Sequence, residues 1–213
     1  MPFVADAAVF WEFAMNETLP LATIQNAVLE FLRGRNDAVL FGAQAVNAYV
    51  LERRTTEDVD VLSTRAADLA EELRAYLNER FHIAARVRNV RDGLGYRVFQ
   101  LRKEGNRHLV DVRPVSALPS AQRIADVQVL LPSELIASKV ISHHQRHGKP
   151  KSWTDRRDLA VLLETFPELK CDPGPVTDCL YAAHANEAVL ALWRELVAQE
   201  ILPQEEDDDF DFS

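Results

Sequence analysis

The sequence predicts a mixed α/β (α+β) fold, in which a sheet flanked by helices is followed by a helical part. Strand-like runs alternate with amphipathic helical patterns up to residue 131, and only helical patterns follow from Pro132 onward. The chain has 213 residues and 47% hydrophobic content, enough for a compact core with a helical appendage. We therefore expect an α/β domain at residues 1–131 and a helical domain at residues 132–203.

Apolar periodicity and turn residues place the elements of the α/β part. A helix is expected over 21–33, closed by Gly34, and the apolar run 38–41 indicates a buried strand that ends at Gly42. The elements expected next are a helix at 43–51, a strand at 59–63, an amphipathic helix at 65–80, and β-rich segments at 82–90, 96–102, 107–113 and 127–131. Turns at Asp92-Gly93 and Glu104-Gly105-Asn106 indicate that the segments 96–102 and 107–113 form a hairpin.

The second part of the chain is expected to be wholly helical. The predicted helices cover 133–146, 154–165, 175–184 and 186–199. A basic segment at 143–151 is interpreted as a linker between the first two, and the Pro- and Gly-rich segment 167–175 as a connector.

Composition limits the kind of protein this is. The formal net charge is −9, and six of the carboxylates lie in the acidic tail 204–213, which is expected to be disordered. Removing these six from −9 leaves −3, so the rest of the chain does not suggest bulk binding of nucleic acid. This balance does not exclude a local basic groove. Two cysteines without a Cys-x-x-Cys motif favour a reducing, cytoplasmic compartment. We expect no membrane-spanning segment.

The segment RRTTEDVDVL at residues 53–62 carries two carboxylates one residue apart. In a strand, Asp58 and Asp60 would share one face, while Val59 and Val61 would face the core. Two carboxylates this close repel each other unless a cation lies between them, and a divalent ion with oxygen ligands such as Mg²⁺ suits the pair. A solvated strand end is the ordinary alternative, because isolated Asp-x-Asp pairs are common.

Two further features favour the metal site. Gly42 ends a buried strand and opens a helix, where backbone can approach a ligand and the helix N-terminus favours phosphate. Asp111 lies between Val110 and Val112 in a later predicted strand, and a carboxylate there needs a partner. Pairing with Arg113 or a position at the edge of the sheet is the ordinary explanation, and a shared metal is the functional one.

This combination of motifs resembles the nucleotidyltransferase superfamily, over residues 38–165. The matching pattern is a strand ending in Gly42-Ala43, a helix, Asp58-Val59-Asp60 on the next strand and Asp111 on a later one. The stretch Arg54-Thr55-Thr56-Glu57 before the two aspartates is similar to that of the AbiEii-type nucleotidyltransferases, many of them toxins of toxin–antitoxin pairs. The resemblance implies a nucleotidyltransferase-like mixed sheet.

The resemblance also implies roles for particular residues. Asp58, Asp60 and Asp111 would be catalytic and would hold Mg²⁺ or Mn²⁺. The residues implied to bind the nucleotide are Gly42, Ala43, Arg54, Thr56, Lys139, Arg157 and Asp158. The substrate would be an NTP, the acceptor the 3′ end of an RNA such as tRNA, a protein hydroxyl or a small molecule, and the partner of a toxin of this type would be an antitoxin protein.

Two positions leave alternatives open. Ala43 stands where the family usually has Ser or Gly, so the second hypothesis is a nucleotide-binding or regulatory protein with weak or no catalysis. Lys139 lies in the apolar stripe of its predicted helix, so it extends to solvent, pairs with an acid, or reaches a cleft shared with the α/β part. Asp155 and Asp158, in the first turn of the next helix, could either favour the helix dipole or orient this lysine.

Overall fold

One seven-stranded sheet organises the chain, which the computed structural model describes over residues 19–90, 94–103 and 105–201. The strand order is β3-β4-β5-β2-β1-β7-β6. The strands are β1 (Ala38–Phe41), β2 (Val59–Ser63), β3 (Ala85–Val90), β4 (Gly95–Gln100), β5 (Arg107–Pro114), β6 (Ala121–Ile124) and β7 (Val127–Leu130). β2 pairs parallel with β5, and β1 pairs parallel with β7, while the other neighbours are antiparallel.

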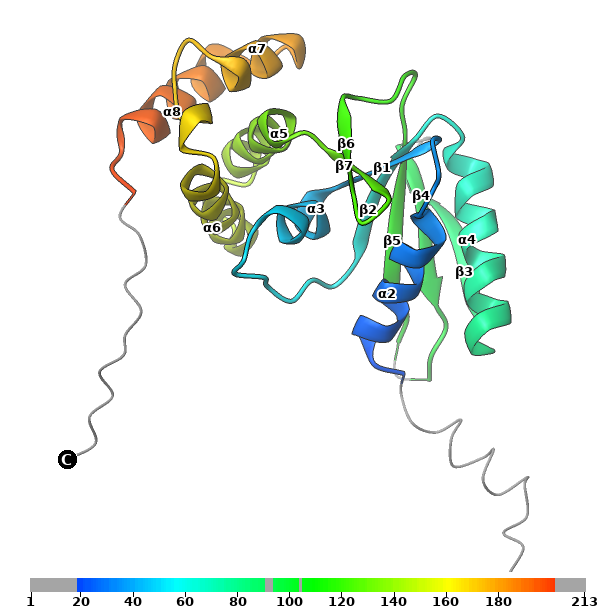
Figure 1. Cartoon of the computed structure of the whole chain (residues 1–213). Helices are drawn as coiled ribbons and strands as arrows, with labels where there is room; N and C mark the ends of the chain where they lie inside the picture. The colour runs from blue at the N-terminus through cyan, green and yellow to red at the C-terminus, as the bar shows by residue number, and fades with distance from the viewer. Residues whose placement is uncertain (1–18, 91–93, 104, 202–213) are drawn as a thin grey trace, which may run out of the picture.

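The helices lie on both sides of the sheet, and those that follow β7 pack against one another. They are α2 (Leu21–Leu32), α3 (Gly42–Tyr49), α4 (Ala66–Phe81), α5 (Pro132–Gln145), α6 (Pro150–Thr165), α7 (Pro175–Ala182) and α8 (Glu187–Ala198), with a short 3₁₀ turn at Pro167–Leu169. Figure 1 shows α2 and α4 together on one side of the sheet and α3 with α5 and α6 on the other. α4 contacts β3, β4 and β5, whereas α3 contacts β1, β2 and β7 and packs against α5 and α6.

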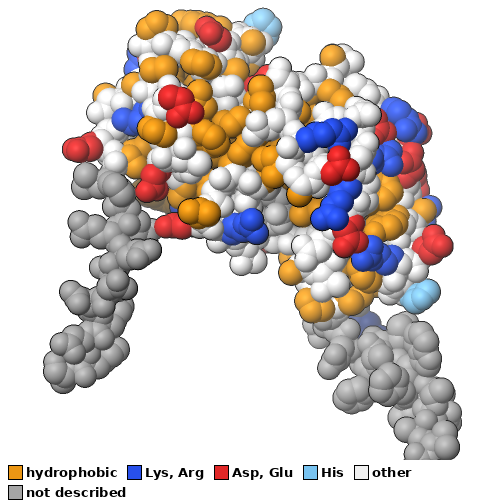
Figure 2. All heavy atoms as spheres, viewed as in Figure 1, with side chains coloured by type: hydrophobic (Ala, Val, Ile, Leu, Met, Phe, Trp, Pro, Cys, Tyr) orange, Lys and Arg blue, Asp and Glu red, His pale blue; other side chains and the backbone are white. Residues whose placement is uncertain are grey.

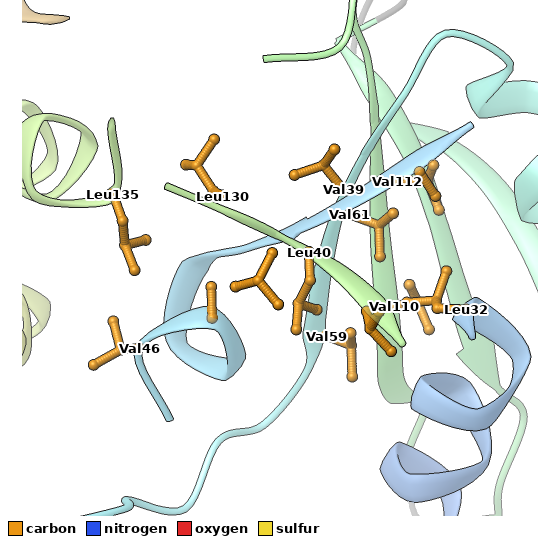
Figure 3. Packing of buried hydrophobic residues seen from close by; sticks show 14 of the residues in the cluster. Leu32, Val39, Leu40, Val46, Val59, Val61, Val110, Val112, Leu130 and Leu135 are labelled. Carbon is orange, nitrogen blue, oxygen red and sulfur yellow. The ribbon is translucent and has the colours of Figure 1, made fainter. Parts of the chain in front are cut away.

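The core of the sheet is built from valines in the central strands (Figure 3). Val59, Val61, Val110 and Val112 are completely buried. Burying a valine stabilises the fold by roughly 1.5–3 kcal/mol, and a shift of one residue would turn all four valines to the wrong face. The residues between them in each strand must therefore face the opposite side of the sheet.

The structure confirms the mixed α/β fold class and the hairpin of β4 and β5. Two elements differ from the prediction. β6 was not predicted, because its sequence Ala-Gln-Arg-Ile has neither an apolar run nor an alternation of apolar and polar residues. None of its residues is fully buried. The helix expected at 154 begins at Pro150, because a proline in the first turn needs no N–H partner. The linker is consequently limited to 146–149, and the expected connector contains the 3₁₀ turn.

Two parts of the sequence prediction, the turn at 92–93 and the acidic tail at 204–213, lie outside the described residues. Within the described ranges, no helix is long and apolar enough to cross a bilayer. Over α2 and α4, basic and acidic side chains are interspersed (Figure 2), as in the pairs Arg80–Glu30 and Arg65–Glu72. Among the described residues of α2 and α4, opposite charges thus alternate across this surface.

Candidate functional site

Three carboxylates meet on the face of the sheet opposite the central valines. In the parallel ladder of β2 and β5, Asp60 lies directly beside Asp111. Asp58 precedes β2 by one residue and, two positions before Asp60, shares its face. All three side chains are largely shielded, with 27%, 19% and 17% of Asp58, Asp60 and Asp111 exposed. The alternation predicted from the sequence thus places them on one face of the sheet.

Gly42 packs directly against this carboxylate group. Its backbone is left-handed, with φ of +70°, and a Cβ at this position would overlap the carboxylate of Asp60. The cause is the strand pairing, which places Phe41 opposite Asp60 and makes Gly42 the next residue along. Glycine is therefore required here both for its conformation and for its missing side chain. Ala43 follows in the first turn of α3, whose N-terminus has no side-chain cap.

Asp60 is the carboxylate whose charge is least compensated. Burial, together with the neighbouring charges of Asp58 and Asp111, raises its pKa to about 6, although the charges of Arg113 and Lys139 act in the opposite direction. Arg113 is only loosely paired, since its guanidinium lies 3.7 Å from Oδ1 of Asp60 and stacks over the ring of Phe41 at 4.8 Å. An ionised Asp60 is therefore costly unless a cation joins the site.

Asp111 is fully paired, but not with the expected Arg113. Arg97 lies directly opposite it on β4 and donates two parallel hydrogen bonds, from Nε at 2.9 Å and from a terminal nitrogen at 3.0 Å. Nε2 of His108 lies 2.9 Å from the same carboxylate. Burial alone would raise the pKa of Asp111, yet the hydrogen bonds from His108 and Arg97 hold this pKa well below its usual range.

His108 joins the site because β5 contains a β-bulge. Residues three apart in a regular strand point to opposite faces, but the pairing with β4 skips Leu109, so that Phe99 pairs with His108 and Val98 pairs with Val110. His108 therefore lies on the same face as Asp111. Its Nδ1 is 3.2 Å from Asp58, and the ligand atoms of Asp58, His108 and Asp111 lie within 4.8 Å of one another.

The loop before Asp58 is held by hydrogen bonds from two helices. Thr56 is buried and accepts hydrogen bonds at its hydroxyl from Gln25 at 3.1 Å and from Gln44 at 2.7 Å. Asn47 binds both backbone groups of Arg54, with its amide donating to the carbonyl and its oxygen accepting from the N–H. These contacts anchor the segment that carries Arg54 and Asp58.

A buried network of charges connects this loop to the helical part. Lys139 donates to Asp158 at 2.6 Å and to Asp155 at 3.3 Å. Arg54 forms two hydrogen bonds with Asp158, at 2.7 and 2.9 Å, and Arg146 binds Asp155 at 2.8 Å. Burial would raise the pKa of Asp158, but its contacts with Arg54 and Lys139 lower it. Of the three interpretations of Lys139, pairing with acids is the one observed.

One predicted site residue lies apart from this network. Arg157 has 42% of its side chain exposed and lies 3.7 Å from Glu52, because it points to a different side of α6 from its neighbour Asp158. The sequence reasoning missed Arg97 and His108. The pairing of Arg97 with Asp111 depends on the same bulge that brings in His108, because a regular ladder continued from Phe99 and His108 would pair Arg97 with Val110. The bulge has no clear sequence signal.

A pocket of about 360 Å³ opens beside Asp111. Its lining also includes Arg97, Arg113, Val90, Leu94 and Gly95. The site therefore combines clustered carboxylates, a glycine turn at a helix N-terminus, an adjacent pocket and two arginines. Such a group suits metal-assisted chemistry on an anionic substrate.

Comparison with known proteins identifies the fold. No family model and no curated protein sequence matches the chain. Among solved structures, the polyadenylate synthase of Megavirus superposes with a TM-score of 0.57 at 12% identity, covering 72% of this chain and 33% of that one. This chain thus spans about a third of the viral enzyme.

Two Helicobacter pylori structures match over more of their own length. A candidate nucleotidyltransferase superposes with a TM-score of 0.52 at 16% identity, covering 83% of this chain and 88% of that one. The protein JHP933 gives a TM-score of 0.50 at 14% identity, with 83% and 87% covered. At these identities the likeness concerns the fold, and this chain accordingly has a nucleotidyltransferase-like fold.

Proposed function

We propose that the protein is a divalent-metal-dependent nucleotidyltransferase that moves a nucleotide from an NTP to a hydroxyl acceptor. The observation that carries the proposal is the convergence of Asp58, Asp60 and Asp111 beside Gly42. Nucleotide transfer needs carboxylates for metal ions and a close backbone approach for the triphosphate, and these residues offer both. An AbiEii-type relationship, with a toxin role and an antitoxin partner, is part of this proposal.

The donor set suits Mg²⁺ or Mn²⁺: Asp58, His108 and Asp111 have ligand atoms within 4.8 Å of one another, and Asp60 would join them from the same face of the sheet. Carboxylate oxygen is the ligand that both ions prefer, and a cation would offset the burial and the repulsion from Asp58 that raise the pKa of Asp60. The low pKa of Asp111 keeps it ionised, which suits a metal ligand better than a proton acceptor. When bound, the metal neutralises charge on the transferring phosphoryl group.

The proposed triphosphate site lies between α3 and the buried charge network. The N–H groups of Gly42 and Ala43 would bind phosphate oxygens, and an alanine provides the same N–H as the usual serine. Lys139 and Arg54 would neutralise phosphate charge. Both cations act electrostatically on the carboxylates of the site, since Lys139 lowers the pKa of Asp60 and Asp58 raises the pKa of Arg54. Asp158 orients both cations. Thr56 supports the loop, and Arg157 would act from the rim.

A second function is favoured by the pairing of Asp111. Arg97 and His108 already occupy this carboxylate, so the fold could bind an NTP without completing a two-metal centre. The protein would then be a nucleotide-binding or regulatory module. Calorimetry with Mg²⁺ and each NTP, combined with a pyrophosphate assay, separates the two functions, because the regulatory module binds without releasing pyrophosphate.

We predict that Asp60→Asn and Asp58→Asn each lower nucleotide transfer by on the order of a hundredfold or more, because metal ligands supply several kcal/mol of transition-state stabilisation. The measurement is incorporation of label from NTPs into lysate or total RNA. Asp68→Asn, at an exposed position on α4, is the matched control and should remain active. Undiminished labelling by both site variants would exclude the enzymatic proposal.

Asp60→Asn should stabilise the metal-free protein at pH 8. The folded-state pKa of Asp60 is raised to about 6 from 3.8, so above pH 6 its ionisation in the buried site costs about 3 kcal/mol. The gain should shrink as pH falls from 6 toward 4 and should vanish only below 3.8, where the carboxyl becomes protonated in the unfolded state as well as in the folded one. Denaturant unfolding with a chelator present measures this.

Addition of Mn²⁺ provides the second half of this test. The wild-type protein should gain stability from the ion, because binding to the folded state alone shifts the equilibrium, and Asp60→Asn should gain much less. An effect of Asp60→Asn that is equal at pH 8 and pH 5 would contradict the assigned cause.

Arg97→Gln should strengthen metal binding. The guanidinium holds both oxygens of Asp111, and a divalent ion must compete with it for the carboxylate. We expect roughly tenfold tighter Mn²⁺ binding by calorimetry, the scale of one charge-assisted hydrogen bond. Arg74→Gln on α4 is the control. If the metal-free Arg97→Gln variant melts at a lower temperature and Mn²⁺ restores its melting temperature, the metal replaces the guanidinium at Asp111. An unchanged affinity for Mn²⁺ would contradict this competition.

A further inference from the structure

The outer half of the sheet carries basic side chains on one face. α4 contacts β3, β4 and β5 on the face of the buried Val98 and Val110. The alternation of strand residues turns Arg86 and Arg88 of β3 to the opposite face, where both are exposed. Arg97 and Phe99 of β4 lie on this same face, because they pair directly with Arg88 and Arg86. We call these four residues the arginine face.

The arginine face is continuous with the carboxylates. One row of directly paired residues runs across four strands, from Asp60 to Asp111, Arg97 and Arg88. Neighbouring strands are about 4.8 Å apart, so the backbone of Arg88 lies roughly 10 Å from that of Asp111. A molecule bound over this face has one end at the proposed metal site.

Arg97 is paired with Asp111, but the charges of the other two arginines of this face are not balanced by the described residues of the protein. Among the described residues, neither Arg86 nor Arg88 has a carboxylate partner, in contrast to Arg65 and Arg80 on the α4 side, which are paired with Glu72 and Glu30. Neighbouring arginines repel each other, and an anion would relieve that repulsion. This face therefore complements a negatively charged molecule.

The aromatic residue of the arginine face indicates which kind of anion fits. The guanidinium of Arg88 lies over the ring of Phe99, 5.9 Å from its centroid, and Phe99 is only partly buried. Exposed planes of this kind stack unpaired bases, while neighbouring arginines bind the phosphates between them. A base pair within a duplex has no free face to offer, so the arrangement favours a single strand.

We propose that the arginine face binds the 3′-terminal nucleotides of a single-stranded RNA and directs the terminal hydroxyl toward Asp60 and Asp111. The inference rests on the proposed nucleotidyltransferase function and specifies its acceptor. Arg86 and Arg88 bind phosphates, and a base stacks on the plane formed by Arg88 and Phe99. The pocket between Val90 and Arg113 lies beside this path and receives the end of the strand.

The test is equilibrium binding of a single-stranded RNA of about 12 nucleotides, labelled at its 5′ end, by fluorescence anisotropy without NTP. The double variant Arg86→Gln/Arg88→Gln should bind at least about tenfold more weakly. The slope of its logarithmic salt dependence should also fall by about 1.4, or about 0.7 for each phosphate that an arginine no longer neutralises. Arg74→Gln/Arg80→Gln removes the same charge from α4 and should leave binding unchanged.

Phe99→Leu distinguishes stacking from simple charge attraction. Loss of one stacked base should weaken binding about fivefold or more without changing the salt dependence, and a duplex of the same sequence should bind more weakly than the single strand. Equal weakening by the arginine-face and α4 double variants would overturn the proposal. Tighter binding of a duplex, of single-stranded DNA or of an acidic peptide would also overturn it.

This experiment separates the inference from the proposed function. RNA binding needs no turnover. If the protein bound RNA at the arginine face but never transferred a nucleotide, the RNA-binding proposal would be supported and the enzymatic function would be excluded. Suppose instead that wild-type protein labels an acceptor while the arginine-face variants bind RNA as well as wild type does. That result would support the enzymatic function and overturn the proposal that the arginine face binds RNA.

Discussion

The parallel pairing of β2 with β5 is the constraint on which the site depends. It sets Asp60 beside Asp111, and the burial of the alternating valines prevents either strand from shifting by one residue. The same packing determines the position of Gly42, because β1 continues the ladder and brings its end against Asp60. The repulsion within the site is thus maintained by hydrophobic burial elsewhere in the sheet.

Ion pairs within the protein already occupy much of the site. Arg97 holds Asp111, and Asp158 holds both Lys139 and Arg54. A metal–triphosphate complex would therefore bind by exchanging partners, with metal replacing guanidinium at the acid and phosphate competing with carboxylate at the cations. Removing one member of a buried pair is strongly unfavourable, so metal and nucleotide should bind more readily together than separately.

Sequence patterns predicted the residues whose positions follow from simple periodicity. The alternation around Asp58 and Asp60 was sufficient to place both carboxylates on one face, and the end of the apolar strand was sufficient to place Gly42. Buried residues of β1 and β2 enforce both positions. Lys139 was identifiable because a lysine in an apolar stripe needs an acid. Properties that depend on register or on irregularity were not predictable: the bulge that brings in His108 follows from strand pairing.

The strand order gives the site a direction. β2 and β5 carry Asp60 and Asp111. On one side of them lie β1 and α3, followed by Lys139 and Arg54. On the other side lie β4 and β3, with Arg88. The first cationic region is buried and paired with acids, whereas the second is exposed. Phosphoryl transfer requires the attacking and leaving oxygens to be roughly in line. Carboxylates placed between two separate cationic regions allow the triphosphate and the acceptor to approach from opposite sides, as that geometry demands.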